Sequence, residues 1–366
     1  MTISLSGLHP AFIAGTLGQG GAERQLYYIL KALKESGADP CLICLTQGEY
    51  WETPIRELGI PVIHAGASPS RSSRLMKIMR ILKSLKPDII QSQHFYTNLY
   101  ASLAARAIGA REIGAIRNDV TSEVRSNGRL LGNLSLKMPR LLAANSRAAI
   151  RTAAGLGVPL SRIFYLPNAV DTDLFRPAQQ RNDDDGGGVK IVSAGRLTEQ
   201  KRFDRLLRIV DKLRKLTAVE FKVSIYGMGE LSQSLEAMAA AMGLQPFVEF
   251  RGLASDPREV YKQADIFVLT SDWEGTPNVV LEAMASGLSV VATAVGDIPE
   301  IIDHGQSGFV YDRQNEAAMA AKLAELIENR DLRVQTGRTS CKKMEDCHSL
   351  QHLPHVLQEL YQKVIR

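Results

Sequence analysis

The chain has 366 residues, a length that favours two domains over one. Hydrophobic residues make up 45% and charged residues 23%, which is ordinary for a globular protein and excludes collagen-like, disordered and disulfide-scaffold classes. No run approaches the ~18 apolar residues of a membrane span, and the first residues do not resemble a secretory signal. Together with the use of only four cysteines, this leads us to expect a cytoplasmic protein in a reducing compartment.

The net charge of +5 is unevenly distributed. Residues 1–175 hold 20 Lys and Arg against 12 Asp and Glu, a net charge of +8. Residues 176–366 hold 24 against 27, a net charge of −3. Such an asymmetry indicates that one half meets an anionic partner, or only that two solvated faces differ.

Short apolar runs alternate with amphipathic stretches along the whole chain. In the first half we expect strands, with helices such as 22–34 and 100–107 between them, at residues 11–14, 41–45, 61–64, 88–93, 112–116, 141–144 and 163–166. After residue 188 the pattern restarts, with expected strands at 190–194, 221–226, 248–250, 265–269, 289–292 and 309–311. This alternation is typical of βαβ units, so the fold class is α/β with two parallel sheets.

The domain organisation follows from this restart. We expect a first doubly wound domain at residues 1–175, a second at 176–350, and a terminal helix at 351–366 that packs back on the first domain. A polar, glycine-rich connector at 183–188 lies between the two patterns. Ligands of such sheets bind beyond the carboxyl ends of the strands, so a deep cleft between facing domains is the expected site.

Two turns that follow strands could bind an anion. In the first, glycines between Gly15 and Gly21 precede a helix, whose N-terminal N–H groups favour negative charge. In the second, Arg196 and Lys201 follow the strand at 190–194 and could neutralise a diphosphate. A tight turn without a ligand and a solvated basic turn are the respective alternatives.

The segment at residues 271–287 is more informative. We expect a helix with Thr276 as its N-cap, Pro277 at its first position and Gly287 at its end. Glu274 then lies just before the helix and Glu282 inside it. This places a carboxylate, which can orient sugar hydroxyls, beside N–H groups that can hold phosphate.

In their order and spacing these segments resemble the retaining glycosyltransferases of family 4, which have the GT-B architecture of two Rossmann-like domains. The resemblance covers about residues 15–312. It is carried by Gly20 to Arg24, by Arg196 and Lys201, by the E-x7-E pair Glu274 and Glu282, and by the segments at 166–171, 226–230 and 296–300. Asp297 and Ala169 depart from positions where the family often has glycine.

The resemblance implies a role for each matching position. Catalytic roles fall on Glu274, His94, Arg196 and Lys201. Donor-binding roles fall on Arg196, Lys201, Glu274 and the following residues: Gly20, Gly21, Arg251, Gly252, Leu253, Gly275, Thr276, Pro277, Asn278, Val279 and Glu282. The resemblance implies no cofactor and no essential metal, the nucleotide-sugar being a substrate; the cysteines and histidines at 341–355 lack the matched pairs of a zinc site.

A basic stretch in the first half suggests a further partner. Residues 71–86 hold six cations and no acid, with an apolar stripe of Leu75, Ile78, Met79, Leu82 and Leu85. Lys77, Arg80 and Lys83 gather on the opposite flank, where they could meet an anionic membrane or remain merely solvated. The stretch lacks the interleaved aromatics of a nucleic-acid binder.

The leading expectation is a retaining hexosyltransferase that moves a hexose from a UDP-sugar to a glycan or lipid-linked acceptor in polysaccharide biosynthesis, either free in the cytoplasm or peripheral on the inner face of the cell membrane. Three alternatives stay open: transfer to a small soluble acceptor, a GT-B-like sugar-nucleotide epimerase, and a non-catalytic nucleotide-sugar-binding subunit. Donor sugar, acceptor, linkage and oligomeric state are not predicted.

Overall fold

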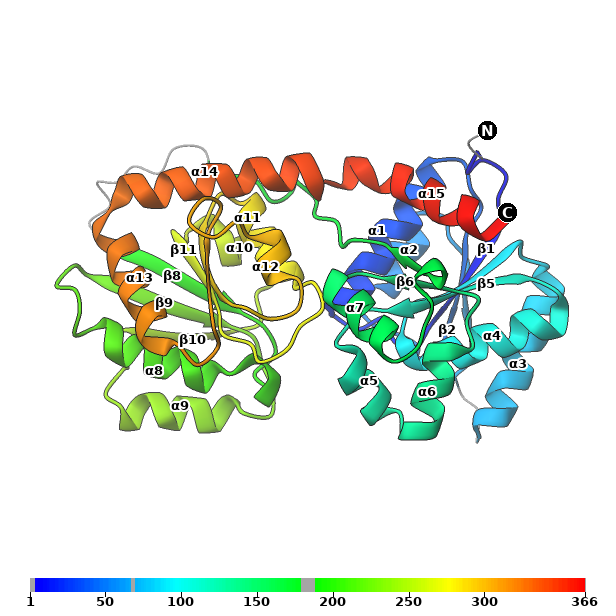
Figure 1. Ribbon diagram of the computed structural model, residues 1–366, viewed down its shortest axis with the longest axis horizontal. Coiled ribbons are helices and arrows are strands. Elements are labelled where there is room, and N and C mark those ends of the chain that lie inside the picture. Colours follow the sequence, from blue (N-terminus) through cyan, green and yellow to red (C-terminus); the bar gives the residue numbers. More distant parts are fainter. Residues whose placement is uncertain (1–3, 67–69, 179–187, 366) are drawn as a thin grey trace. The chain divides into compact units, whose positions relative to one another are not determined.

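The structure is a computed structural model that describes residues 4–66, 70–178 and 188–365. It divides into two compact units, one made of Met1–Ala169 with Leu350–Arg366 and one of Val170–Ser349. Of the expected connector at 183–188, all but Gly188 lies outside the described residues. Each unit is an α/β layer structure with its own parallel sheet (Figure 1).

The first unit contains a parallel sheet with seven strands among its described residues, in the order β3-β2-β1-β4-β5-β6-β7. The strands are β1 (Pro10–Ala14), β2 (Cys41–Cys44), β3 (Val62–His64), β4 (Ile89–Ser92), β5 (Arg111–Ile116), β6 (Leu141–Ala144) and β7 (Ile163–Tyr165). The strands are buried on both faces because helices cover both.

The helices of the first unit fall on two faces. The face formed by Phe12, Leu42 and Ile113 packs against α1 (Gly21–Glu35), α2 (Glu52–Glu57) and α15 (Leu353–Ile365). The other face packs against α3 (Arg71–Leu85), α4 (Asn98–Ile108), α5 (Val120–Ser126), α6 (Arg129–Lys137) and α7 (Arg147–Gly155). Short 3-10 turns lie at Phe95–Thr97 and Leu160–Arg162.

The second unit holds a parallel sheet with six strands among its described residues, in the order β10-β9-β8-β11-β12-β13. The strands are β8 (Val189–Ala194), β9 (Phe221–Tyr226), β10 (Val248–Gly252), β11 (Ile266–Leu269), β12 (Ser289–Thr293) and β13 (Phe309–Tyr311). One face packs against α8 (Phe203–Leu213), α9 (Ser232–Ala241) and α13 (Glu316–Glu328). The other carries α10 (Pro257–Lys262), α11 (Asn278–Ala285), α12 (Ile298–Ile301) and α14 (Arg330–Cys347), and a 3-10 turn lies at Glu199–Lys201.

Each strand expected from the sequence is a strand in the structure, and no end differs by more than two residues. The strand orders reveal where each sheet can bind a ligand. In the first unit the chain winds outward from β1 through β2 to β3 and then returns to β4, so β1 and β4 form the topological switch point. In the second unit β8 and β11 hold the same position. Open α/β sheets bind ligands beyond the carboxyl ends of such strand pairs.

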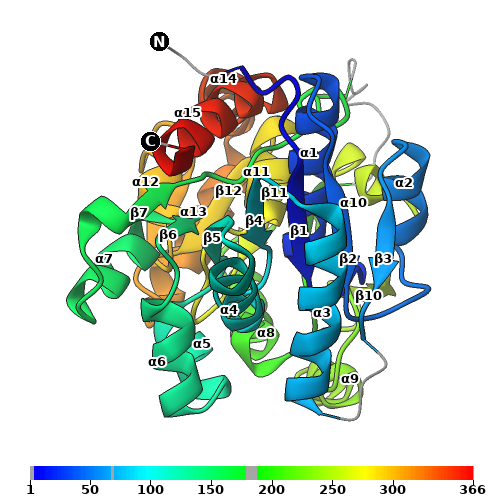
Figure 2. The same cartoon turned by 90° about the vertical axis from the view of Figure 1, so that its right-hand side faces the viewer.

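The terminal helix packs on the first unit, as the sequence predicts. Tyr361 of α15 is fully buried, and α15 lies against α1 (Figure 2). The expected apolar stripe of α3 is confirmed at Ile78 and Leu82, which are buried. Leu85, the last residue of the helix, is 39% exposed, so the stripe is not buried along its whole length.

Candidate functional site

Lys201 and Glu274 form an ion pair at the switch point of the second unit. Lys201 ends the 3-10 turn after β8, and Glu274 lies in the loop between β11 and α11. The Lys201 Nζ atom donates to Glu274 Oε1 at 2.5 Å, and Ser271 Oγ donates to the same oxygen at 2.7 Å. Glu274 is only 9% exposed, so this carboxylate is held in one position by charge and by burial.

The turn that carries Lys201 is fixed to the loop that carries Glu274. The Gln200 amide donates to Trp273 O at 2.8 Å, and Asp272 N donates to Gln200 O at 2.9 Å. The next residue, Arg202, has a left-handed backbone (φ 51°), which is costly for a residue other than glycine. Asp272 compensates, because it accepts hydrogen bonds from Arg202 Nη1 and Arg205 Nη2, both at 2.7 Å.

Helix α11 begins one residue later than the sequence predicts. Pro277, with extended backbone angles, is the N-cap in place of Thr276, and no side chain caps the helix. The N-cap residue thus offers no side-chain acceptor to the start of the helix, where the helix dipole favours an anion. Gly287 follows the end of the helix with φ 73°, as expected. Another glycine, Gly296, allows a close approach, since a Cβ there would lie 2.2 Å from Gly275 O.

The remaining predicted donor residues of the second unit are placed as follows. Glu282 is 4% exposed and accepts a hydrogen bond from the Tyr261 hydroxyl at 2.8 Å. Arg196 is exposed in the turn after β8. Arg251 is ion-paired with Glu249 at 2.7 Å near the end of β10. Gly252 ends that strand, and Leu253 is 62% exposed.

The switch point of the first unit holds His94, Gly20 and Gly21. His94 follows β4, and its Nδ1 atom accepts a hydrogen bond from Gly15 N at 3.1 Å. The Nε2 atom lies 3.2 Å from Glu23 Oε1, so the hydrogen-bond network assigns the ring proton to Nε2, which donates to Glu23. Gly20 is the N-cap of α1, with no side-chain cap, and Gly21 is its first residue.

Glu23 itself belongs to the hydrogen-bonded set around His94. Burial opposes its ionisation, but hydrogen bonds from His94 and Thr16 outweigh burial and lower the pKa of Glu23. The ring of Tyr96 stacks on His94 with centroids 5.5 Å apart. Gly15 lies so close to Tyr96 that a Cβ at Gly15 would overlap the Tyr96 hydroxyl.

Sequence reasoning missed four polar partners of the predicted residues. These are Ser271, Tyr261, Asp272 and Glu23. Glu23, Ser271 and Asp272 stand inside or beside segments that the sequence had singled out, so their position was a usable signal. Tyr261 had none, because 21 residues separate it from Glu282 and only the packing of α10 on the sheet brings them together.

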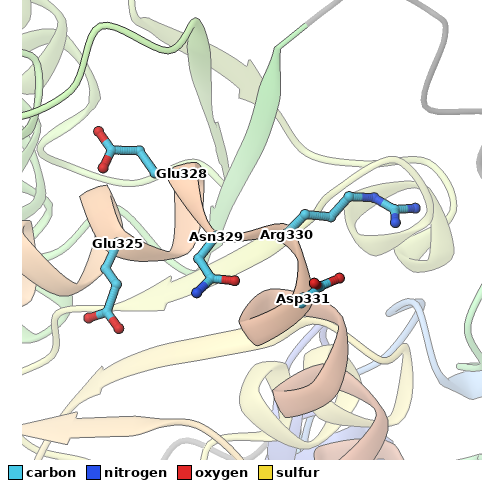
Figure 3. Close-up of a pocket in the computed structure, with 5 residues that line it drawn as sticks. All are labelled: Glu325, Glu328, Asn329, Arg330 and Asp331. Carbon is cyan, nitrogen blue, oxygen red and sulfur yellow. The ribbon is translucent and has the colours of Figure 1, made fainter.

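A hollow elsewhere in the second unit does not coincide with these residues. It has a volume of about 380 Å³ and is lined by Glu325, Glu328, Asn329, Arg330 and Asp331, where α13 meets α14. Figure 3 shows that the ends of these side chains point to different sides instead of converging.

Within residues 4–66, 70–178 and 188–365, no three His, Cys, Asp or Glu side chains gather closely enough to hold a metal ion. No helix in the same residues is long and apolar enough to cross a membrane.

Comparisons with known families match both halves of the chain. The model described as "Glycosyltransferase Family 4" matches residues 19–174. The model described as "Glycosyl transferases group 1" matches residues 175–343. The first match contains His94, Gly20 and Gly21, and the second contains Lys201 and Glu274.

Curated relatives are similar over part of their length. An uncharacterised glycosyltransferase of Haemophilus influenzae is 33% identical over 157 residues, 43% of this chain and 44% of the relative. A GDP-mannose-dependent alpha-(1-6)-phosphatidylinositol monomannoside mannosyltransferase of Mycobacterium tuberculosis is 32% identical over 202 residues, 51% of this chain and 52% of the relative. The chain thus spans about half the length of these relatives.

Solved structures show the fold along nearly the whole chain. Anabaena HepE in complex with UDP-glucose gives a TM-score of 0.86 at 18% identity, covering 97% of this chain and 100% of that one. Sucrose-phosphate synthase of Thermosynechococcus elongatus gives 0.81 at 14% identity, covering 98% and 99%. At these identities the similarity concerns the fold alone.

Proposed function

Because this chain belongs to the GT-B glycosyltransferases built from a family 4 domain and a group 1 domain, we propose that it is a retaining hexosyltransferase that uses a UDP-sugar. The observation that carries the proposal is the buried ion pair of Lys201 and Glu274 at the β8–β11 switch point. A cation for phosphate and a carboxylate for sugar hydroxyls stand side by side there, next to the uncapped start of α11.

The roles of the donor-binding residues follow from their chemistry. Lys201 and Arg196 would hold the diphosphate and stabilise negative charge on the departing phosphate. The N–H groups from Gly275 to Val279, at the start of α11, would bind phosphate and sugar oxygens. Glu274 would accept hydrogen bonds from sugar hydroxyls, and Glu282 from the ribose. Arg251, Gly252 and Leu253 would border the base.

Retention of the anomeric configuration would follow a substrate-assisted, front-face path. The bond between the anomeric carbon and the donor phosphate oxygen breaks as the acceptor hydroxyl oxygen bonds to the same face. The leaving phosphate takes the acceptor's proton. Positive charge from Lys201, Arg196 and α11 serves the purpose that a metal ion serves in other transferases, so we propose transfer without a resident metal.

In the first unit, His94 would contribute through its ring. With Nδ1 occupied by Gly15 N–H and Nε2 directed at Glu23, the imidazole is held in one orientation at the end of β4. A donor-sugar hydroxyl could bind at Nε2 in exchange for Glu23. Gly20 and Gly21 would offer backbone N–H groups at the start of α1 to a phosphate oxygen.

Two findings support a UDP-sugar donor and a glycan or lipid-linked acceptor. HepE, which shares the fold, is known in complex with UDP-glucose. Relatives include a phosphatidylinositol mannoside mannosyltransferase and a putative colanic acid biosynthesis glycosyltransferase of Salmonella typhimurium, the latter 30% identical over 178 residues, 46% of this chain and 43% of the relative. The mannosyltransferase depends on GDP-mannose, so GDP-sugars belong in the test.

The test is a thermal-shift screen of the purified protein against UDP- and GDP-sugars, followed by assays of donor consumption. A donor at 100 times its Kd should raise the free energy of unfolding by about 2.7 kcal/mol. Lys201→Ala should lose most of the shift, whereas Lys190→Ala, at the opposite end of β8 and exposed, should keep it. Absence of a shift with every UDP-sugar would contradict the proposed donor.

Product analysis separates the alternatives. A transferase that acts on lipid-linked acceptors should move radioactivity from a labelled donor into the lipids of a membrane extract. A transferase that acts on soluble acceptors should move it to small alcohols or sugars. An epimerase should convert the donor without any acceptor. A non-catalytic subunit should bind the donor and consume none, and that result would contradict the proposed activity.

We also propose that α3 meets an anionic membrane surface. Arg71 and Met76 are exposed on it, Arg80 and Lys83 are exposed as well, and the helix carries no acid. Each cation near a charged surface contributes about 1 kcal/mol.

Replacement of Lys77, Arg80 and Lys83 by Gln should abolish salt-sensitive sedimentation with phosphatidylserine liposomes. Replacement of Arg125, Arg129 and Lys137, exposed on α5 and α6, should not. Equal sedimentation of both variants would refute this surface.

A further inference from the structure

Arg117 is partly exposed, but one edge of its guanidinium is buried without a partner among the residues that the structure describes. It directly follows β5, the neighbour of β4 in the first unit's sheet. The Nε and Nη2 atoms are both buried and neither makes a hydrogen bond. These two atoms form the side-on fork with which arginine binds two oxygens of one oxyanion.

Among the described residues, no carboxylate compensates the charge of Arg117. The pKa of Arg117 is lowered to about 10, with burial as its sole cause and no acid acting to raise it. Buried charges in proteins are normally paired, because an unpaired ion and unsatisfied N–H groups cost free energy. An uncompensated guanidinium at the carboxyl ends of the strands, where such sheets bind ligands, is therefore best explained by a partner outside the protein.

The position of Arg117 in the sheet places it among polar side chains. Gln91 pairs with Ile113 in the register of β4 and β5, on the face covered by α1, and Gln93 and Arg117 directly follow the ends of these two strands. Gln93 is fully buried, its amide donates to Ala22 O of α1 at 2.6 Å, and its Oε1 atom has no partner. On the other side, Asn145 donates to the carbonyl of Arg117 at 3.4 Å.

We propose that Arg117 binds a phosphoryl group of the acceptor, with its Nε and Nη2 atoms each donating to one phosphate oxygen. This rests on the proposed function, in which the second unit holds the donor diphosphate and leaves the first unit for the acceptor. The unpartnered Oε1 of Gln93 then suits a hydroxyl of the same ligand, so the acceptor is a phosphorylated or diphosphate-linked polyol or sugar.

The experiment measures binding of inorganic pyrophosphate, by calorimetry in phosphate-free buffer, to the whole protein saturated with UDP. Wild-type protein should bind. Arg117→Met should bind about 10- to 100-fold more weakly, since two charge-assisted hydrogen bonds are lost. Arg117→Lys, which keeps the charge without the fork, should lie between them. Arg125→Met, exposed on α5, should bind as wild type.

A stability measurement separates a binding role from a structural one. Without pyrophosphate, Arg117→Met should unfold at the wild-type temperature or above it, because it removes an unpaired buried charge. Equal pyrophosphate binding by wild type and Arg117→Met, no binding by wild type, or a clearly lowered unfolding temperature of the variant would overturn the proposal. Loss of UDP binding in Arg117→Met would instead assign the fork to the donor. Since pyrophosphate binding needs no transfer, its result is independent of whether the proposed activity is found.

Discussion

The Nζ atom of Lys201 lies 2.5 Å from Oε1 of Glu274, so the two side chains proposed to bind the donor also bind each other. Their side chains are 15% and 8% exposed, so the ion pair is largely buried and is not screened as a surface ion pair would be. The ion pair holds Lys201 in a defined position before phosphate arrives, and it leaves Glu274 with its charge compensated. Donor binding then exchanges partners that are already oriented.

Lys201→Met should destabilise the protein by about 3 kcal/mol, because it leaves a buried carboxylate with only the hydroxyl of Ser271. Adding Glu274→Gln should recover most of that loss, since the uncompensated charge disappears. Urea unfolding of wild type, both single variants and the double variant measures this coupling. The double variant should be stable and yet lose donor turnover by about 10²- to 10³-fold. If stability losses are additive, the pair does not interact.

Asp272 should act on turnover through the position of Lys201. Asp272→Asn removes the charge that holds Arg202 in its left-handed conformation and Arg205 in its buried position. We expect a loss of stability of about 3 kcal/mol. We also expect a fall in kcat, because the turn that carries Lys201 is released.

Asp211→Asn, which breaks only the pairs of this α8 residue with Arg214 and Lys215, should cost less than about 1 kcal/mol and leave kcat unchanged. Equal effects of the two variants would contradict this role.

The same network should set part of the acid limit of stability. Burial opposes ionisation of Asp272, but hydrogen bonds from Arg202 and Arg205 outweigh burial and lower its pKa. The pKa of Asp204 is lowered in the same way by Arg202 and Arg208. Because the folded pKa is below the unfolded value of about 3.9, the stabilisation is complete above that pH and is lost as the pH falls through the folded pKa.

Unfolding temperatures between pH 7 and pH 2 test this expectation. In Asp272→Asn, the unfolding temperature should fall less steeply below about pH 4 than it does in wild type. Glu123 should affect stability in the opposite direction, because burial raises its pKa and makes its ionisation near neutral pH unfavourable. Glu123→Gln should therefore raise stability at pH 7 and leave the acid fall intact. An unchanged acid fall in Asp272→Asn would contradict the assignment.

The sequence predicted the sheets well because apolar runs of three to six residues are a local signal. It also predicted that Lys201 would lie in a turn after a strand and Glu274 in the loop just before a helix. It could not predict that they touch, because 73 residues separate them and strand order is a property of tertiary packing. The start of α11 was misplaced by one residue, since the fixed φ of Pro277 fits both the N-cap and the first helical position.

Arg117 shows the limit of a local reading. In the sequence it is one of many arginines in a basic half, beside Asn118 and Asp119, where a solvated turn is the ordinary expectation. Only the packing around β5 reveals that two of its nitrogen atoms are buried without a partner. Burial and satisfaction of polar atoms depend on the whole fold, and no spacing of residues encodes them.

The attachment of the terminal helix can be tested at a single hydroxyl. Tyr361 of α15 donates to Gln91 Oε1 of β4 at 2.9 Å, and both side chains are fully buried. The Gln91 amide nitrogen already lacks a partner, so loss of the tyrosine hydroxyl would leave this buried amide unsatisfied at both ends. Tyr361→Phe should therefore lower the free energy of unfolding by about 1–3 kcal/mol in urea titrations. Tyr50→Phe, which removes the same hydroxyl from a residue that is 51% exposed, should change it by less than about 0.5 kcal/mol. If the two variants unfold alike, the α15 contact with the sheet rests on apolar packing alone.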